Sequence, residues 1–154
     1  MKYIWYLIKD LIQVSYGIIQ TLAGLIMFIV YIDKPHSFYR GNIVTKWDTL
    51  SGLSLGLFLF TADDNKIELE QYVGGTKADL EEYSHKILVH EYGHSIQSLL
   101  LGPLMVFLGI ISFVWGSKKY ERYRIENKLP YTYCFVEKWA SYLGEKYSHE
   151  AAIW

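Results

Sequence analysis

Two histidines and a glutamate near the middle of the chain, His90, Glu91 and His94, form an H-E-x-x-H motif. Residues four apart lie on the same face of an α-helix, so both imidazoles can reach one metal ion. Glu91 lies between them, close enough to a metal-bound water to take its proton. The alternative is a helix with two ordinary histidines and no metal. The residue types and their spacing therefore predict a zinc site, with Glu91 as a general base.

A catalytic zinc needs three protein ligands and keeps one position for water. His90 and His94 supply two of them, and the third must come from elsewhere in the chain. His36 and His149 could provide it, and Glu145 and Glu150 are weaker alternatives. The remaining histidine, His85, falls on another side of the motif helix, and we expect it at the surface.

Downstream of the motif the chain reads Glu137-x-x-Ala140-Ser141, followed by Leu143-Gly144. Together with H-E-x-x-H, this stretch resembles the E-x-x-A-D motif of gluzincins such as the membrane-bound CAAX prenyl endopeptidases and the heat-shock membrane metallopeptidases. The pattern is matched at the Glu and the Ala, and Ser141 stands where those families have an aspartate. Residues 90–103 are also similar to small uncharacterised bacterial membrane proteins with an HEYGH signature. The resemblance covers about residues 50–145.

The resemblance implies that Glu137 is the third zinc ligand and that the reaction is metal-assisted hydrolysis of peptide bonds. Ser141 would then orient a ligand histidine through one hydrogen bond, without the charge of an aspartate. A donor must stabilise the oxyanion, and Tyr131, Tyr133 and Arg122 are near Glu137 in sequence. Packing is the alternative role for each of these three residues.

The expected function is a membrane-associated zinc metalloendopeptidase that acts on peptides or membrane-associated proteins. Its main rival is a zinc-binding membrane protein without hydrolytic activity, which would act as a regulator or an assembly module. Glu91 favours the enzyme, because a structural zinc site needs no base. A third interpretation has no metal and leaves only an aromatic-rich bundle of membrane helices.

Composition indicates one domain that meets a lipid bilayer. The 154 residues are 51% hydrophobic and 17% aromatic, with 14 Tyr and 5 Trp, residue types that settle at membrane interfaces. The net charge of −1 gives no basic field for nucleic acid. A single cysteine, Cys134, excludes an intrachain disulfide framework.

Hydropathy and turn residues predict an α+β membrane protein. Residues 11–32 carry no charge and are long enough to span a bilayer, so residues 1–32 are expected to form an uncleaved transmembrane anchor. Residues 33–154 would form a minimal zincin-like domain. Within it, 33–52 read as a connection, and 53–60 with 67–73 as a β-hairpin. Thr76 and Asp79 form a capping box that opens the motif helix, which ends at Gly102-Pro103.

The apolar residues 98–116 present a topological conflict. If they crossed the bilayer, His94 and Glu137 would lie on opposite sides and could not share one zinc. We therefore expect a re-entrant or interfacial helix, followed by C-terminal helices that are interrupted at Leu129-Pro130. With a single span, residues 33–154 hold 13 of the 15 Lys and Arg residues. The positive-inside rule then places the site on the cytoplasmic side of a bacterial cytoplasmic membrane.

Overall fold

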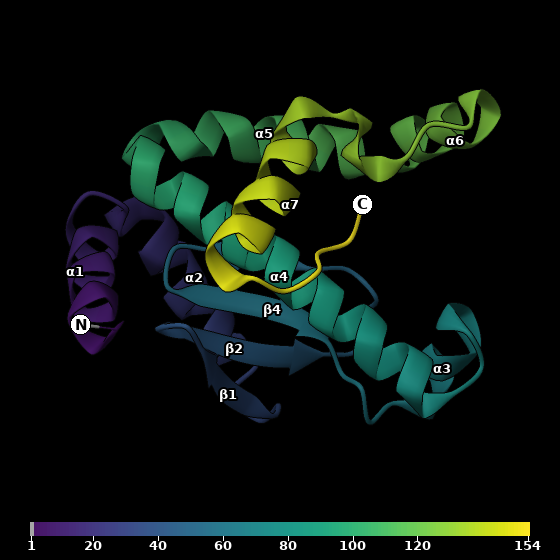
Figure 1. Cartoon of the computed structure of the whole chain (residues 1–154), viewed down its shortest axis with the longest axis horizontal. Helices are drawn as coiled ribbons and strands as arrows, with labels where there is room; N and C mark the ends of the chain where they lie inside the picture. The colour runs from purple at the N-terminus through teal and green to yellow at the C-terminus, as the bar shows by residue number, and fades with distance from the viewer. Residues whose placement is uncertain (1) are drawn as a thin grey trace.

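A long helix, α4, lies on a four-stranded sheet, and the C-terminal helix α7 packs across it (Figure 1). The computed structural model describes residues 2–154 and confirms the α+β class. The helices are α1 (Lys2–Ser15), α2 (Ile18–Val30), α3 (Ile67–Val73), α4 (Lys77–Leu101), α5 (Met105–Gly116), α6 (Lys118–Asn127) and α7 (Phe135–Ser148). The short 3₁₀ turns are η1 (Gly102–Leu104) and η2 (Tyr131–Tyr133).

The sheet has the strand order β1-β2-β4-β3. Its strands are β1 (His36–Tyr39), β2 (Asn42–Trp47), β3 (Leu53–Leu55) and β4 (Phe58–Ala62). β2 and β4 are parallel, whereas the two edge strands pair antiparallel. Val44 and Leu59 of the sheet, Tyr92 and Ile96 of α4, and Leu143 of α7 share one buried cluster. This core fixes α4 between the sheet and α7.

The strand predictions were only partly right. Residues 53–60 do not form one strand, because Gly56 adopts a positive φ of 62° and turns the chain between β3 and β4. The hairpin therefore lies within residues 53–62. Residues 67–73, predicted as its second strand, form helix α3 instead. The alternation in this stretch is short, and Ile67 and Tyr72 are exposed, so no buried face holds it in a sheet.

Residues 33–52, predicted as a connection, contain two strands. β1 and β2 form an antiparallel hairpin around Arg40-Gly41, where both residues have positive φ. β2 is buried at positions on both faces, because Val44 packs against α4 on one face and Trp47 packs with side chains of α2 on the other. Burial on both faces removes the simple alternation of apolar and polar residues that marks a half-buried strand.

The motif helix follows its predicted signals closely. The Thr76 hydroxyl accepts a hydrogen bond from the backbone N–H of Asp79, as a capping residue does. Helix α4 continues to Leu101, and Gly102 ends it with a φ of 52°. The C-terminal residues form two helices, α6 and α7, interrupted around Leu129-Pro130 as expected.

The predicted N-terminal anchor is not one straight helix. α1 and α2 meet at a bend of 95° around Tyr16-Gly17. Together the two helices are long and apolar enough to cross a membrane, but only if they are counted as one segment across this bend. One further helical segment, Lys77–Gly116, is long and apolar enough to cross a membrane by length and composition.

Polar side chains explain the bend. Lys9 is buried, and its ammonium group donates to the carbonyl of Arg40 (3.0 Å) and to Asn42. Gln13 Nε2 donates to the Ser95 carbonyl at 2.8 Å, and Gln20 Nε2 to the Gly102 carbonyl at 2.6 Å. These bonds tie α1 and α2 to the motif helix and its end. Mean hydropathy does not detect them, because the polar residues face the protein and the apolar ones face out.

Candidate metal centre

Close packing of α4 and α7 builds the site. A Cβ added to Gly93 would lie 1.8 Å from the Ala140 carbonyl oxygen, and one on Gly144 would lie 2.2 Å from the Val89 carbonyl oxygen. Only glycine therefore allows the two backbones to approach this closely. The approach brings Glu137, on the first turn of α7, against the histidine face of α4.

The structure groups His90, His94 and Glu137 as three residues that could hold a metal ion. Glu137 Oε2 lies 3.1 Å from His90 Nε2 and 3.3 Å from His94 Nε2. All three side chains are buried, and Glu137 is only 1% exposed. The ligand set implied by the resemblance is thus brought together in space.

Each histidine is oriented by a second hydrogen bond at its other ring nitrogen. His94 Nδ1 lies 2.7 Å from Gln97 Oε1, and Gln97 Nε2 donates to the Val136 carbonyl. His90 Nδ1 lies 2.8 Å from Ser141 Oγ, the contact expected for Ser141. Both partners present oxygen lone pairs to the rings. Both Nδ1 atoms therefore carry protons, and both Nε2 atoms face Glu137.

This arrangement points three acceptors at one place. Two imidazole lone pairs and a carboxylate repel one another unless a proton or a cation lies between them. The other carboxylate oxygen, Glu137 Oε1, is buried with no hydrogen-bond partner among the described residues. Three ligands of one tetrahedral zinc, each about 2.0–2.1 Å from it, would be about 3.3 Å apart. The observed separations of 3.1 and 3.3 Å fit that geometry.

In the protein alone, a proton takes the place between these groups. Burial by itself would lower the pKa of His94, but its contact with Glu137 outweighs burial and raises that pKa to about 9. Burial would likewise raise the pKa of Glu137, and its contacts with the two histidines hold it well below 4.5 instead. A divalent cation satisfies the same three atoms by replacing this proton.

Glu91 lies on the same helix, buried beside the three potential ligands. Burial raises the pKa of its carboxyl to about 7, the range in which a general base works best near neutral pH. The backbone of Gly52, in the loop before β3, lies against the carboxylate, since an added Cβ would be 2.2 Å from Glu91 Oε1. A larger residue at position 52 would displace the Glu91 side chain.

The three oxyanion candidates differ in their placement. Tyr133 is 65% exposed, and Arg122 is also exposed. Tyr131 is 38% exposed, yet burial of its hydroxyl end and the charge of Glu137 raise its pKa above 10.0. Ser112 of α5 interacts with both Tyr131 and Glu137 and lowers the pKa of each. Of the three candidates, Tyr131 is the one that the structure places beside the site.

The alternative third ligands are occupied elsewhere. His36 Nδ1 contacts the Thr45 hydroxyl in the sheet, and His149 ends α7. Glu145 accepts hydrogen bonds from the Ala152 N–H and the Trp154 indole. Glu150 binds Arg40 and His85, and His85 is exposed as predicted. Among the described residues, none of these four alternatives joins His90 and His94 in a group that could hold one ion, whereas Glu137 does.

Several residues that support this centre were not predicted from the sequence. Gln97 could have been found, because it lies three residues after His94 on the same helix face. Gly93 and Gly144 carry a weaker signal, a small residue in each of two helices. Ser112 and the segment after α7 reach the site only through the tertiary fold, and no local pattern marks them.

Comparisons of the chain with family models, curated proteins and solved structures find no match. Function is therefore inferred from the geometry of the centre.

Proposed function

We propose that this protein is a membrane-associated zinc metallopeptidase that hydrolyses peptides or membrane-associated proteins. One observation carries the proposal: α7 brings Glu137 within 3.3 Å of both Nε2 atoms of an H-E-x-x-H helix. His90, His94 and Glu137 would hold the metal, and Glu91 is the remaining acidic group of the motif. Two imidazoles and a carboxylate are a ligand set used by zinc hydrolases.

When bound, zinc supplies the Lewis acidity that lets a water molecule lose a proton near pH 7. Glu91 accepts that proton as the water oxygen attacks the carbonyl carbon of the scissile peptide bond. Glu91 then returns the proton to the amine nitrogen as the C–N bond breaks, so the products are a carboxylate and an amine. The pKa of Glu91, raised by burial, suits a group that both accepts and donates.

Tyr131 is the proposed donor to the developing oxyanion. Its raised pKa keeps the hydroxyl protonated, and Ser112 of α5 lies close to it. A single preorganised donor of this kind contributes on the order of 3 kcal/mol to transition-state stabilisation. Because Ser112 belongs to the most apolar helix of the chain, the site lies next to the proposed membrane surface.

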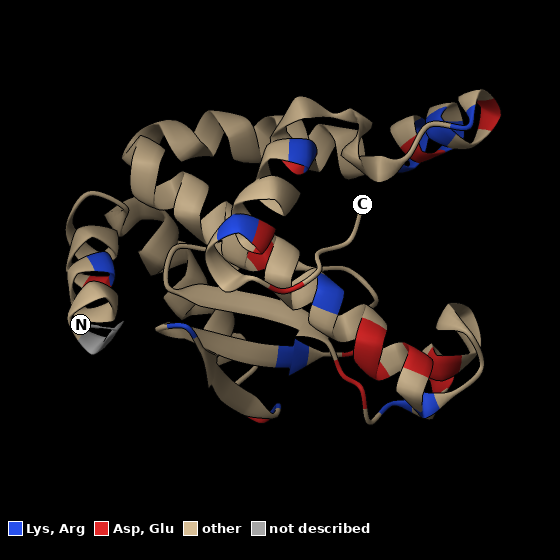
Figure 2. Cartoon of the chain, viewed as in Figure 1, with Lys and Arg blue, Asp and Glu red and all other residues tan. Residues whose placement is uncertain are grey.

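Three helices present apolar side chains outward, and we propose that a lipid bilayer covers them. α2 and α5 contain no charged residue, whereas α6 carries a dense group of charges (Figure 2). The outward side chains include Ile4, Leu7 and Leu11 of α1, Ile19, Leu22, Ile26 and Ile29 of α2, and Phe107, Ile110 and Phe113 of α5. The basic residues of α6 follow α5 directly and are placed to meet lipid headgroups.

The contact between His94 and Glu137 constrains how α5 meets the membrane. The chain between these residues cannot cross the bilayer once, because its two ends meet at one site. At about 1.5 Å per residue, the 12 residues of α5 reach about 18 Å, less than the ~30 Å hydrocarbon core. We therefore propose that 98–116 form a re-entrant or interfacial helix, with the site on the cytoplasmic side.

Vesicle flotation tests the membrane face. Replacing Ile26 and Phe113 together by aspartate should release the protein from phosphatidylcholine–phosphatidylglycerol vesicles, since each charge opposes burial in hydrocarbon. Ile67→Asp, at an exposed position on α3, should leave flotation unchanged. Equal flotation of the double variant and the wild type would contradict the assignment of this face.

The rival function, a zinc-binding module without hydrolysis, is favoured by the burial of all four groups at the centre. Glu91→Gln separates the two functions, because it removes the base and keeps the three ligands. For a peptidase, we expect loss of cleavage by about 10²–10⁴-fold with zinc binding retained. Zinc binding with no peptide cleavage by the wild type, against a broad peptide library in detergent or lipid, would favour the module.

A further inference from the structure

The segment after α7 returns to the metal centre. Residues 149–154 form neither helix nor strand, and His149 turns the chain back with a φ of 63°. The carbonyl oxygen of Ile153 then accepts a hydrogen bond of 2.6 Å from Ser141 Oγ. Ser141 is the residue that orients His90. A continuous chain of contacts therefore runs from the Ile153 carbonyl through Ser141 to a proposed metal ligand.

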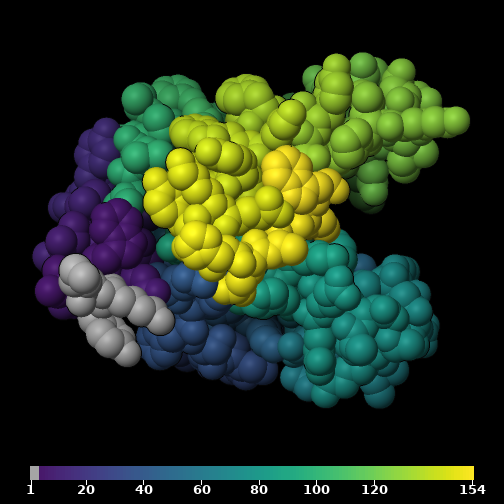
Figure 3. Space-filling view, in the orientation of Figure 1, coloured from purple at the N-terminus to yellow at the C-terminus, as the bar shows by residue number. Residues whose placement is uncertain are grey.

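The segment is fixed along its length and does not lie at random on the surface. Arg40 donates to the Ser148 carbonyl and to Glu150, each at 2.6 Å. Glu145 Oε1 accepts from the Ala152 N–H at 3.0 Å and from the Trp154 indole at 2.7 Å. The space-filling view shows the segment lying beside α7 (Figure 3). These bonds hold the Ile153 carbonyl in place behind Ser141.

A serine needs such a partner to act as an orienting group. A carboxylate can only accept from the imidazole, but a hydroxyl can either accept or donate. If Ser141 donated to His90 Nδ1, the neutral ring would carry its proton on Nε2, the atom that must bind the metal. Because the Ser141 hydroxyl donates its hydrogen bond to the Ile153 carbonyl, a lone pair of Ser141 Oγ faces Nδ1–H. His90 Nε2 is then available to bind the metal.

We propose that residues 149–154 contribute to the metal centre. The Ile153 carbonyl acts through Ser141 to hold His90 in the tautomer that can bind the metal, with its proton on Nδ1. Ser141 and the Ile153 carbonyl together replace the single carboxylate that the resembled families have at this place. Ser141 and Ile153 are positioning residues and do not touch substrate. The inference rests on the metal site proposed above.

Two truncations of the full chain form a matched pair for testing this role. Ending the chain after Ile153 removes Trp154 but leaves a carboxylate oxygen at position 153 to accept from Ser141. Ending it after Ala152 removes that acceptor as well. Both lose the bond between Trp154 and Glu145, so they differ mainly in the acceptor behind Ser141. Zinc affinity, measured by competition with a chelating dye in detergent, is the readout.

We expect the chain ending at Ile153 to bind zinc within about threefold of the wild type. The chain ending at Ala152 should bind roughly 10–100-fold more weakly, the usual effect of losing an outer partner of a ligand. Ser141→Ala should weaken binding similarly, and Ser141→Asp should retain it. Combining Ser141→Ala with the shorter truncation should add little, because both act through one hydrogen-bonded chain.

The tautomer of His90 provides a readout that does not depend on zinc. Long-range ¹H–¹⁵N spectra of the metal-free protein should show a proton on His90 Nδ1 in the wild type. In Ser141→Ala, Nδ1 should lose this proton, and the ring should keep its proton on Nε2, which lies 3.1 Å from Glu137 Oε2. If the chain ending at Ala152 does not fold, this spectrum and the comparison of Ser141→Ala with Ser141→Asp decide the matter. Unchanged zinc affinity and tautomer in Ser141→Ala, or in a folded chain ending at Ala152, would overturn the inference. Failure of the wild type to bind zinc would overturn the metal site, and this inference with it.

Discussion

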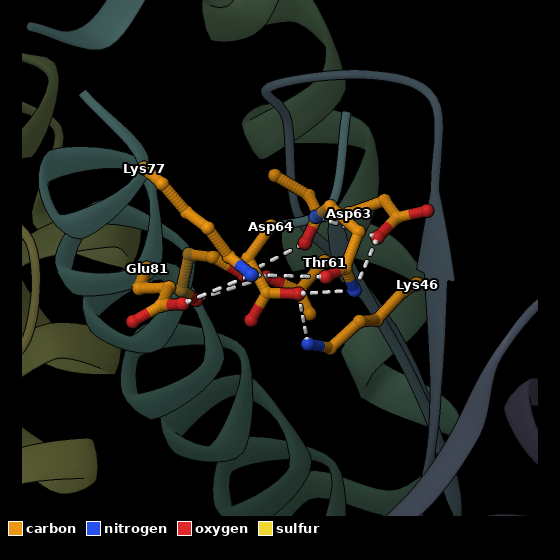
Figure 4. A network of polar contacts seen from close by, with 9 residues as sticks. Lys46, Thr61, Asp63, Asp64, Lys77 and Glu81 are labelled. Atoms are coloured by element: carbon orange, nitrogen blue, oxygen red, sulfur yellow. Dashed lines mark hydrogen bonds and ion pairs between the residues drawn. The ribbon is translucent and has the colours of Figure 1, made fainter. Parts of the chain in front are cut away.

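Two polar clusters on the same helix, α4, behave differently. Near its start, charged groups meet opposite charges (Figure 4). Lys77 lies 3.7 Å from Glu81 on the helix, and beside them Lys46 of β2 pairs with Asp64 in the loop after β4. About four turns later, His90, His94 and Glu137 meet with no Lys or Arg among them, so that only a proton on His94 balances the Glu137 carboxylate. The first cluster is partly exposed and the second is buried. The exposed cluster is neutralised by its own Lys and Asp or Glu side chains, whereas the buried one needs a proton or a metal ion between its three groups.

A cleft beside the first cluster shows that an opening alone does not establish a binding site. A cleft of about 320 Å³ lies between α4 and the sheet, lined by residues that include Lys46, Asp64, Glu81 and His85. All four of these residues are paired with neighbouring charges: Lys46 with Asp64, Glu81 with Lys77, and His85 with Glu150. The charges of these four residues are therefore already satisfied. The metal centre therefore differs from the cleft in having buried groups that a metal ion could bind, and not in the size of its opening.

Removing a ligand should give the largest difference between the clusters. Glu137→Gln keeps the size of the side chain and removes its charge, and we expect zinc affinity to fall by more than about 100-fold. Glu81→Gln, in the balanced cluster, should leave affinity within about twofold. Equilibrium dialysis with zinc measures both variants. Similar zinc affinity in Glu137→Gln and the wild type would remove Glu137 from the ligand set and restore the alternatives to consideration.

Separating the two helices should give the next largest effect. Gly93→Ala places a Cβ against the Ala140 carbonyl, 1.8 Å away before relaxation, so α7 must move outward. We expect a loss of about 1–3 kcal/mol in stability together with weaker zinc binding. Gly109→Ala is the matched control, because nothing lies within 4 Å of its added Cβ. Thermal unfolding in detergent, with and without zinc, checks both. A wild-type unfolding temperature in Gly93→Ala would contradict the close approach of α4 and α7.

Loss of an orienting bond should give the smallest effect of the three. Gln97→Met removes the acceptor for His94 Nδ1, and we expect zinc affinity to fall about tenfold. Gln20→Met removes another buried glutamine, one that binds the Gly102 carbonyl and not a histidine. It should lower the unfolding temperature without changing zinc affinity. Equal effects of the two substitutions on zinc affinity would mean that Gln97 acts only through stability.

The parts of the fold that local sequence predicted are those with local causes. The capping residue Thr76 and the break at Gly102-Pro103 depend on neighbours in the chain, and α4 begins and ends beside them. The bend at Gly17 depends instead on Gln13 and Gln20, which find partners in a distant helix and turn. β1 and β2 were missed for the same reason, since β1 is mostly exposed and pairs only with β2, and β2 is buried by the distant helices α2 and α4.

The candidate site shows the same division. The spacing of His90, Glu91 and His94 is a local property of one helix. Glu137 came from a resemblance, and its placement required the glycine contact between α4 and α7. The replacement of an aspartate by Ser141 left open what supports the serine. Its partner is the Ile153 carbonyl, twelve residues further along the chain, which only the folded structure brings next to Ser141.

The central claim is that the three buried acceptors hold one metal ion. The most direct test is the metal content of the full-length protein purified in detergent and loaded with zinc, combined with zinc X-ray absorption spectroscopy. We predict about one zinc per chain, bound by two imidazole nitrogens and oxygen ligands at about 2.0–2.2 Å. A protein that retains no zinc after loading, or zinc without imidazole in its coordination shell, would contradict the account.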